Sequence, residues 1–332
     1  MGQIELKGPQ LVKGDRPRGS LIPFRFSLQA VEAESRREWV DLVKRVDDAG
    51  FDMLVTADHL GGSLAPIVPL ATAAEVSSRL RLGVIVLNND FHHPSLLARE
   101  AATLDLLSDG RLELGLGAGH ARPEYDRAGI GFDPAPTRVD RLEEAVVVLR
   151  QLLDGAAVTF SGTHYRLRDE RCDLRPAQNH VPILVGGGGR RVLGIAARHA
   201  DAVGFTGLGR TLADGQHHDP DRFRPERVDQ DVALVQTVAG ERLGSLEFQV
   251  LVQAVVVTDG ALRSAEAISR TTLQTLSPQE VLATPYLLVG SRNAIIERLL
   301  EHRERWGFSH YTVRRDALGQ IEPVIAALSD RR

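Results

Sequence analysis

Short apolar runs alternate with amphipathic segments along most of the chain. Residues 24–28 form the first apolar run and predict a β-strand. Ser35 then begins a helix, with Glu38 three residues later as in a capping box, and Gly50 ends it. The apolar side chains of this helix recur at helical spacing: Trp39, Leu42, Val43 and Val46. The pattern therefore predicts a strand followed by a helix.

This strand–helix unit recurs to the end of the chain. The sequence predicts eight strands, which begin at Phe24, Asp52, Arg81, Arg111, Val181, Asp201, Phe248 and Phe308. The run Phe248–Val257 is interpreted as one long apolar strand. Eight strands separated by helices indicate the α/β class and favour a (β/α)8 TIM barrel. A doubly wound parallel sheet is the alternative, because it shows the same alternation.

The chain has 332 residues, whereas a minimal barrel of this kind needs about 250. We therefore expect one barrel domain over residues 23–332 that carries insertions. Three polar or irregular stretches are candidates for them: residues 117–137, 207–246 and 258–290. Residues 1–22 are polar and rich in glycine and proline, and we interpret them as an N-terminal arm.

Composition narrows the class of protein. Hydrophobic residues make up 43% and charged residues 25%, which is typical of a globular chain. The net charge of −4 gives no reason to expect nucleic acid as a partner, and no apolar run is long enough to predict a membrane span. A single cysteine, Cys172, excludes an intrachain disulfide and a cysteine-based zinc site. We expect a cytoplasmic protein.

The second predicted strand is followed by Asp58 and His59. Functional groups of barrel enzymes lie at the carboxyl ends of the strands, and an imidazole there can donate or accept a proton. The alternative is a carboxylate–histidine pair that only closes the following loop.

The third predicted strand ends near Asp90, His92 and His93, a set that suggests a metal site. Adjacent side chains at a strand end point apart, so His92 and His93 are poorly placed to share one ion. The same argument applies to His217 and His218. We therefore predict no metal site.

Two glycine-rich segments follow strands. Gly115, Gly117 and Gly119 remove the side chains from one strand face, so a neighbouring strand or a flat ligand must approach closely. Residues 186–189 are four glycines before Arg190 and Arg191 at the start of a predicted helix. Exposed N–H groups at a helix N-terminus bind anions, so this run predicts a phosphate cradle rather than only a flexible turn. A side chain at Gly188 is then expected to block phosphate with little loss of stability.

Several of these segments, taken together, resemble the bacterial luciferase-like superfamily, and its branch of deazaflavin (coenzyme F420)-dependent oxidoreductases in particular. The resemblance covers about residues 24–206, with residues 286–313 added at the end. It is carried by the segments Gly50-Phe51-Asp52, Asp58-His59, Leu87-Asn88-Asn89-Asp90, Leu104–Arg111, Gly115–Gly119 and Pro182–Gly187.

The resemblance implies a (β/α)8 barrel, a homodimer, and F420 as the cofactor for hydride transfer to or from a small organic substrate with a C=C, C=N or alcohol/carbonyl group. It also implies a non-proline cis peptide at Ile85–Val86 beneath the cofactor ring. Cofactor-binding positions that match the family are Asp58, His59, Ile85, Val86, Asn88, Ala118, Gly119, His120, Gly186, Gly187, Gly188 and Gly189. Arg122 and Arg190 are candidates for the acidic tail of F420.

Three residues are the candidates for chemistry: His59, Asp58 and His120. His59 is expected to assist hydride transfer, and His120 is the alternative proton donor. Two other functions stay open. One is a monooxygenase that uses reduced FMN, since FMN also ends in a ribityl phosphate. The other is a non-catalytic cofactor-binding protein on the same barrel, which would need no proton donor.

Overall fold

The computed structural model describes residues 23–208 and 219–329. The expected N-terminal arm, residues 1–22, lies outside the described residues, as do His217 and His218. No helix in the described ranges combines the length and the apolar character needed to cross a membrane.

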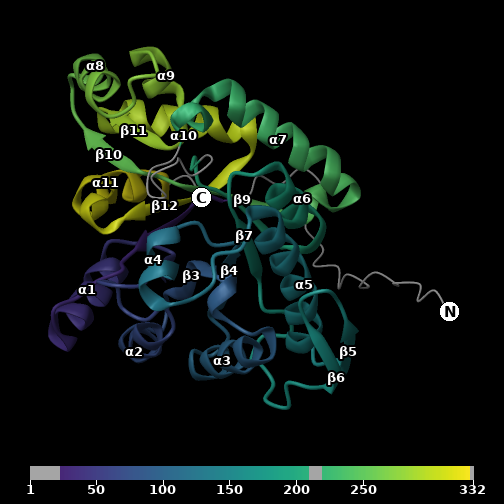
Figure 1. Ribbon diagram of the computed structural model, residues 1–332. Coiled ribbons are helices and arrows are strands. Elements are labelled where there is room, and N and C mark those ends of the chain that lie inside the picture. The colour runs from purple at the N-terminus through teal and green to yellow at the C-terminus, as the bar shows by residue number, and fades with distance from the viewer. Residues whose placement is uncertain (1–22, 209–218, 330–332) are drawn as a thin grey trace.

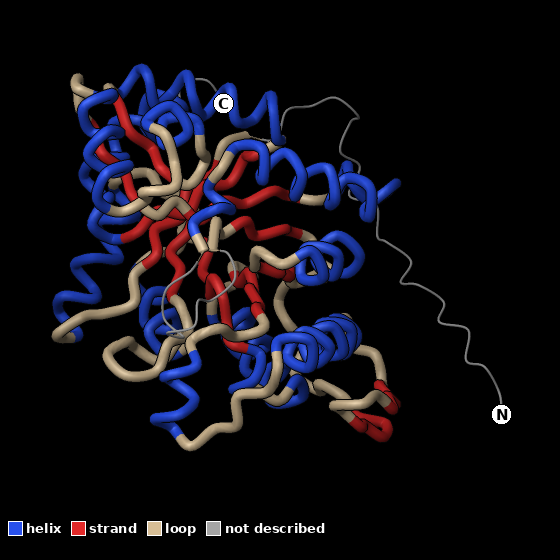
Figure 2. Tube along the Cα trace, turned by 45° about the horizontal axis from the view of Figure 1, so that its top comes forward, coloured by secondary structure: helices blue, strands red, loops and turns tan. Residues whose placement is uncertain are grey.

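Eight parallel strands close into a barrel (Figures 1 and 2). β1 pairs with β2 on one side and with β12 on the other, so the sheet has no edge. This closure confirms the predicted (β/α)8 barrel and excludes the doubly wound sheet. In order around the barrel the strands are β1 (Arg25–Gln29), β12 (Phe308–Arg314), β9 (Glu247–Leu251), β8 (Ala202–Phe205), β7 (Ile183–Gly186), β4 (Leu112–Gly117), β3 (Arg81–Asn88) and β2 (Met53–Thr56).

Helices surround the barrel and bury their apolar faces against it (Figure 2). The Ser35 side chain caps the first helix by accepting from the Glu38 N–H, as the sequence predicts. The Glu38 carboxylate accepts instead from the N–H of Glu34. The outer helices are α1 (Arg36–Asp48), α2 (Val68–Val76), α3 (Pro94–Leu107), α5 (Ala135–Leu153), α6 (Arg190–His199), α7 (Pro225–Ala239), α10 (Arg292–Trp306) and α11 (Leu318–Ser329).

The prediction of one strand over Phe248–Val257 is wrong. The barrel strand β9 ends at Leu251, and β10 (Ala254–Val257) pairs with β11 (Leu287–Gly290) in a separate two-stranded sheet. At the break, the N–H of Gln253 donates to the carbonyl of Tyr286 instead of to a barrel strand. Apolar side chains occur on both sides of the break because the sheet of β10 and β11 also packs on the core, so the hydrophobic pattern does not mark it.

The three stretches expected as insertions contain further elements. Residues 117–137 include α4 (Arg122–Ala128), and residues 207–246 include α7 of the outer ring. Residues 258–290 include α8 (Ala261–Thr271), α9 (Pro278–Ala283) and β11. A hairpin of β5 (Val158–Ser161) and β6 (Arg166–Glu170) follows α5 and was not predicted.

Charged side chains close the barrel at the amino ends of its strands. The Arg25 guanidinium lies 2.6 Å from Glu113 and 2.8 Å from Glu247. His310 Nδ1 lies 3.2 Å from the same Glu247 carboxylate. Burial by itself would raise the pKa of Glu247, but the charges and hydrogen bonds of His310 and Arg25 outweigh it and lower that pKa to about 2. Because these charged residues lie at the amino ends of the strands, we infer that they contribute to stability rather than to catalysis.

We expect Glu247→Gln to lower the free energy of unfolding at pH 7 by up to about 3 kcal/mol, since a depressed carboxyl pKa contributes stability above its unfolded value. That contribution is lost as the pH falls from about 4.5 toward 2, so the variant should also show a flatter acid dependence. Urea unfolding from pH 7 to pH 2 measures both effects.

The matched control is Glu322→Gln, which removes a carboxylate paired with Arg45 on the surface. Its effect should be small, because exposed ion pairs contribute little. Parallel acid profiles for Glu247→Gln and the wild type would contradict the assigned role of this ion pair.

Candidate functional site

Most of the residues singled out in the sequence, among them Asp58, His120 and Gly188, lie at one end of the barrel. They follow the carboxyl ends of β2, β3, β4 and β7, and parallel strands place all these ends on the same side. We call this end the mouth.

Asp58 follows β2 and is 8% exposed. Its Oδ2 atom accepts from the backbone N–H of Asn88, at 3.0 Å, and lies 2.8 Å from Nε2 of His92. His92 therefore joins the mouth as the partner of Asp58, a role that the sequence did not reveal. His93 turns away and accepts from the Ser95 N–H at the start of α3, so the two adjacent histidines diverge as expected.

His59 lies beside a carboxylate on α4. Its Nδ1 is 2.8 Å from Oε1 of Glu124, while Oε2 of Glu124 accepts from the N–H of Leu60 at 3.0 Å. The His59 and His120 rings meet edge to face with centroids 5.5 Å apart. The structure thus brings the two candidate histidines together and adds Glu124, which sequence reasoning missed because 65 residues separate it from His59.

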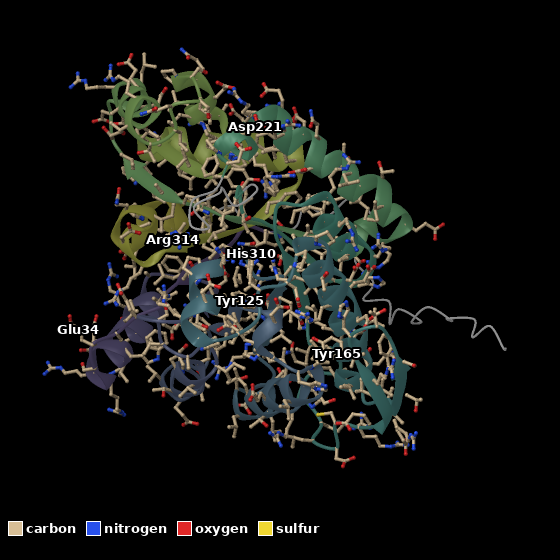
Figure 3. The ribbon with its side chains drawn as sticks, in the orientation of Figure 1. Glu34, Tyr125, Tyr165, Asp221, His310 and Arg314 are labelled. Atoms are coloured by element: carbon tan, nitrogen blue, oxygen red, sulfur yellow. The ribbon has the colours of Figure 1, made fainter. Side chains whose placement is uncertain are left out.

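Tyr125 fixes α4 to the ends of β3 and β4. Its hydroxyl donates to the side-chain oxygens of Asn88 and Asp90, both 2.9 Å away. Burial raises the pKa of this hydroxyl, which keeps it a donor. A Cβ atom at Gly119 would lie 2.1 Å from that hydroxyl oxygen and 2.4 Å from Oδ1 of Asn88, so only glycine fits there. Figure 3 shows Tyr125 near the centre of the molecule.

The segment that contains Ala118 and Gly119 is also held from the outer ring. Arg138 on α5 donates to the carbonyls of Ala118 and Gly119, at 3.2 and 3.3 Å. Its guanidinium lies 4.0 Å from the centre of the Phe132 ring. The neighbouring Arg141 donates to Asp90 at 2.6 Å. These contacts fix the backbone that leads to His120.

Val86 occupies the space that the glycines leave inside the barrel. A Cβ atom at Gly117 would lie 2.7 Å from Val86 Cγ2, and one at Gly186 would lie 2.9 Å from Val86 Cγ1. At Gly115 the obstacle is the Val84 carbonyl oxygen, at 2.2 Å. The close approach predicted for β4 is therefore made by the neighbouring strand. The peptide bond between Ile85 and Val86 is cis, as the family resemblance implies.

The glycine run links β7 to the N-terminus of α6, in the order that the sequence predicts. Gly189 is the N-cap of α6, and a Cβ atom there would meet nothing within 4 Å. Gly188 differs, because its Cβ would lie 2.3 Å from the Leu208 carbonyl oxygen. The expectation that a side chain at Gly188 would spare stability is therefore wrong, since it would clash with the protein's own backbone.

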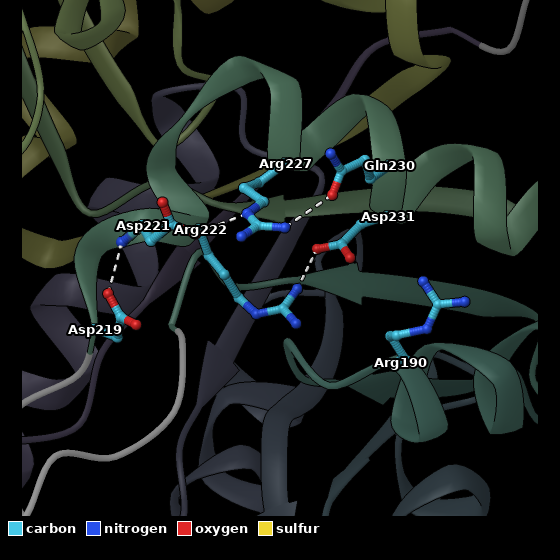
Figure 4. A pocket seen from close by; sticks show the side chains of 7 residues that line it. All are labelled: Arg190, Asp219, Asp221, Arg222, Arg227, Gln230 and Asp231. Atoms are coloured by element: carbon cyan, nitrogen blue, oxygen red, sulfur yellow. Dashed lines mark hydrogen bonds and ion pairs between the residues drawn. The ribbon is translucent and has the colours of Figure 1, made fainter.

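A polar hollow of about 340 Å³ lies beside the glycine run, and its side chains are shown in Figure 4. Arg222 Nη1 pairs with Asp231, and Arg227 lies 2.6 Å from Asp221. Burial raises the pKa of Asp231 even though Arg222 opposes it. Arg190 extends toward the hollow from α6 without an ion pair to any described residue. The lining residues are Arg190, Asp219, Asp221, Arg222, Arg227, Gln230 and Asp231.

Two other arginines from the sequence analysis lie on the surface. Arg191 pairs with Asp140 on α5, so it joins two outer helices. Arg122 is 64% exposed, and its Nε lies 3.4 Å from Asp126 one turn further along α4. Arg222, which the sequence did not single out, lies against the glycine run: a Cβ atom at Gly188 would be 3.0 Å from Arg222 Cδ. Among the residues of the two described ranges, no group of three or more potential ligands is placed to hold a metal ion.

Comparisons with known proteins place the chain among F420-dependent relatives and identify its family. An F420-dependent glucose-6-phosphate dehydrogenase of Microbacterium testaceum is 33% identical over 189 residues, which are 54% of this chain and 56% of that protein. The chain thus aligns with little more than half the length of this curated relative.

Two solved structures share the fold over most of its length. The F420-dependent tetrahydromethanopterin reductase of Methanopyrus kandleri superposes with a TM-score of 0.72 at 17% identity, covering 92% of this chain and 99% of that one. An F420-dependent secondary alcohol dehydrogenase, in complex with an F420–acetone adduct, gives 0.73 at 17% identity with the same coverage. The luciferase-like monooxygenase family matches residues 17–239, which is two thirds of the chain and includes the residues described at the mouth. The chain therefore belongs to the luciferase-like monooxygenase family.

Proposed function

We propose that the protein is an F420-dependent oxidoreductase that transfers a hydride between the deazaflavin and a small organic substrate with an alcohol/carbonyl, C=C or C=N group. The observation that carries the proposal is the placement of a glycine cradle and a carboxylate-bound imidazole, His59, at the same end of the barrel. The F420-dependent relatives named above support the choice of cofactor.

The residues at β7 and α6 fit a ribityl phosphate. The position where a Gly189 side chain would stand is open, and the N–H groups of the first turn of α6 have no helical acceptor. Arg190 adds a positive charge at this point. Phosphate is held there by backbone N–H groups, and the positive end of the helix dipole favours its charge.

The choice of F420 over FMN is supported by the relatives and by Arg190, because the three arginines that line the hollow are balanced in number by three aspartates. F420 carries carboxylates beyond its phosphate, and Arg190, Arg222 and Arg227 line the hollow next to the glycine run. Arg190 is the one of these three without a described ion pair, so we expect it to contribute most to binding the acidic tail.

When bound, the deazaflavin supplies a ring carbon that donates or accepts a hydride. His59 holds or moves the proton at the substrate atom that loses or gains it. Glu124 fixes the His59 ring through Nδ1, which leaves Nε2 for that exchange. Asp58, bound by His92 and by the Asn88 N–H, keeps the backbone of β3 in register with the end of β2.

We expect wild-type protein to bind oxidised F420 more tightly than FMN in a fluorescence titration. Gly189→Val should weaken F420 binding at least tenfold, because a branched side chain fills the open position of the cradle. Gly244→Val, at another open glycine in the 3-10 segment Gly240–Ser245 before β9, is the matched control and should bind F420 normally. Tighter binding of FMN would favour the monooxygenase, and unchanged binding in Gly189→Val would reject the cradle.

We expect His59→Ala to lower the single-turnover rate by about 10²-fold, within the range of general acid–base catalysis, while the dissociation constant of F420 changes little. Glu124→Gln should lower the rate less, since it only loosens the imidazole. Stopped-flow measurements under nitrogen, with a substrate found by screening alcohols, activated alkenes and imines, provide the rates. A larger loss in His120→Ala than in His59→Ala would make His120 the proton donor and His59 a residue that positions the ring.

We also propose a homodimer. Val68 at the start of α2 and Leu96, Leu106 and Leu107 on α3 are between 46% and 70% exposed, and α2 and α3 pack side by side. Large exposed apolar side chains on neighbouring helices are typical of an interface.

Sedimentation at micromolar concentration should give a mass of twice 36.2 kDa. Leu107→Glu should shift this mass toward that of the monomer, because a charge would be buried in the contact. Leu262→Glu, at an exposed leucine on α8, is the control and should remain dimeric. A monomer in the wild type would refute the proposal.

A further inference from the structure

Arg314 is the last residue of β12 and therefore lies at the mouth (Figure 3). Its Nη1 donates to Oε1 of Gln29 at 3.0 Å, and its Nη2 donates to Oε1 of Gln253 at 2.7 Å. Gln29 ends β1, and Gln253 lies in the break between β9 and β10. The guanidinium thus connects neighbouring strands through two neutral side chains.

Both glutamines are held in place from behind. Gln29 Nε2 donates to the Ile85 carbonyl at 2.7 Å, and Gln253 Nε2 donates to the Thr206 carbonyl at 3.0 Å. Because each amide nitrogen is engaged with the backbone, each amide oxygen faces Arg314. The orientation of the guanidinium is therefore fixed before any ligand binds.

Arg314 forms no ion pair with a carboxylate of the described residues, although Asp316 lies near enough to act on its charge. Within the described ranges no Asp or Glu oxygen lies within 4.0 Å of its guanidinium, whereas the next residue, Arg315, pairs with Glu38. Arg314 is half-buried, and burial lowers its pKa. A guanidinium has five N–H donors, and the two glutamines take two of them. Among the described residues nothing accepts from the other three donors, so they remain for a ligand.

The position of Arg314 separates it from the phosphate cradle. In the ring of eight strands β1 lies opposite β7, and β12 is next to β1. Gln29 instead connects Arg314 to the Ile85 carbonyl on β3, beside the Val86 side chain that fills the barrel. An anion at Arg314 is therefore not the phosphate that α6 holds.

We propose that Arg314 binds an anionic group of the substrate, and that the substrate is a small organic anion, a carboxylate or a phosphate ester. The inference rests on the proposed function, because it assigns the substrate side of the same mouth. Carboxylate and phosphate oxygens both fit a planar guanidinium with two donors side by side, and such charge-assisted contacts are among the strong hydrogen bonds of proteins.

The test uses F420-saturated protein and matched pairs of alcohols, each with and without a terminal carboxylate or phosphate. We expect the wild type to prefer the anionic member of the productive pair. Arg314→Gln should raise the KM of that member 10- to 100-fold and leave the KM of its neutral counterpart unchanged, whereas Arg314→Lys should recover part of the loss. The series of alcohols whose KM rises in Arg314→Gln, carboxylate or phosphate, identifies the anion that Arg314 binds. Arg315→Gln, one residue further along, is the matched control and should behave like the wild type.

A second measurement does not depend on the cofactor. In the Gly189→Val background, where the cradle is filled, calorimetry with acetate and with inorganic phosphate should detect an anion site that Arg314→Gln removes and Arg315→Gln retains. No anion binding there, or equal effects of Arg314→Gln on anionic and neutral alcohols, would overturn the inference. The inference would also be overturned if Arg314→Gln changed only the ratio of the affinities for reduced and oxidised F420. Arg314 would then interact with the charged cofactor ring instead of the substrate. Failure of the wild type to bind F420 would reject the proposed function alone, and the calorimetry would still decide the role of Arg314.

Discussion

Packing inside the barrel constrains where every group at the mouth can stand. The Val86 side chain enters the space between β3, β4 and β7, and it fits because Gly117 and Gly186 present no Cβ atoms. Protein interiors are close-packed, so a side chain at either glycine would have to displace Val86 and, with it, β3. The end of β3 supplies the Asn88 N–H to Asp58 and the Asn88 side chain to Tyr125. The positions of the polar groups at the mouth thus depend on the apolar packing of Val86 against the two glycines.

The charged groups at the two ends of the barrel differ in the partners that they contact. At the amino ends, Arg25 and Glu247 satisfy each other, which contributes stability and leaves nothing for a ligand. At the carboxyl ends, His59 contacts Glu124, Asp58 contacts His92, and Arg314 meets amide oxygens instead of carboxylates. Arg314 therefore differs from Arg25 in being held by neutral side chains rather than by bonded carboxylates.

The sequence was sufficient for the barrel but not for its departures from regularity. Each barrel strand is short, contains buried apolar residues and is followed by a helix. The change from strand-like to helical spacing of apolar residues therefore predicts both elements. The break at Gln253 was hidden, because hydrophobicity does not distinguish a strand of the barrel from one of a small neighbouring sheet. Asp58, His59 and the glycine run were found from their position after strands. The roles of Glu124, His92 and Arg314 could not be predicted from the sequence. They depend on contacts between residues 34 to 65 positions apart, or on the register of β1 with β12.

The small sheet of β10 and β11 has a consequence for how such a barrel changes. The two strands run parallel, with Val257 opposite Gly290 and Leu287 opposite Ala254, so the segment between them crosses back along the length of the sheet. The helices of this crossover are packed on the protein, because Ala265 on α8 and Val281 on α9 belong to the same buried core as the barrel helices. A segment grafted here from a related barrel would therefore have to bring side chains that fill the same core positions, so sequence change is least restricted at the exposed positions of residues 258–286.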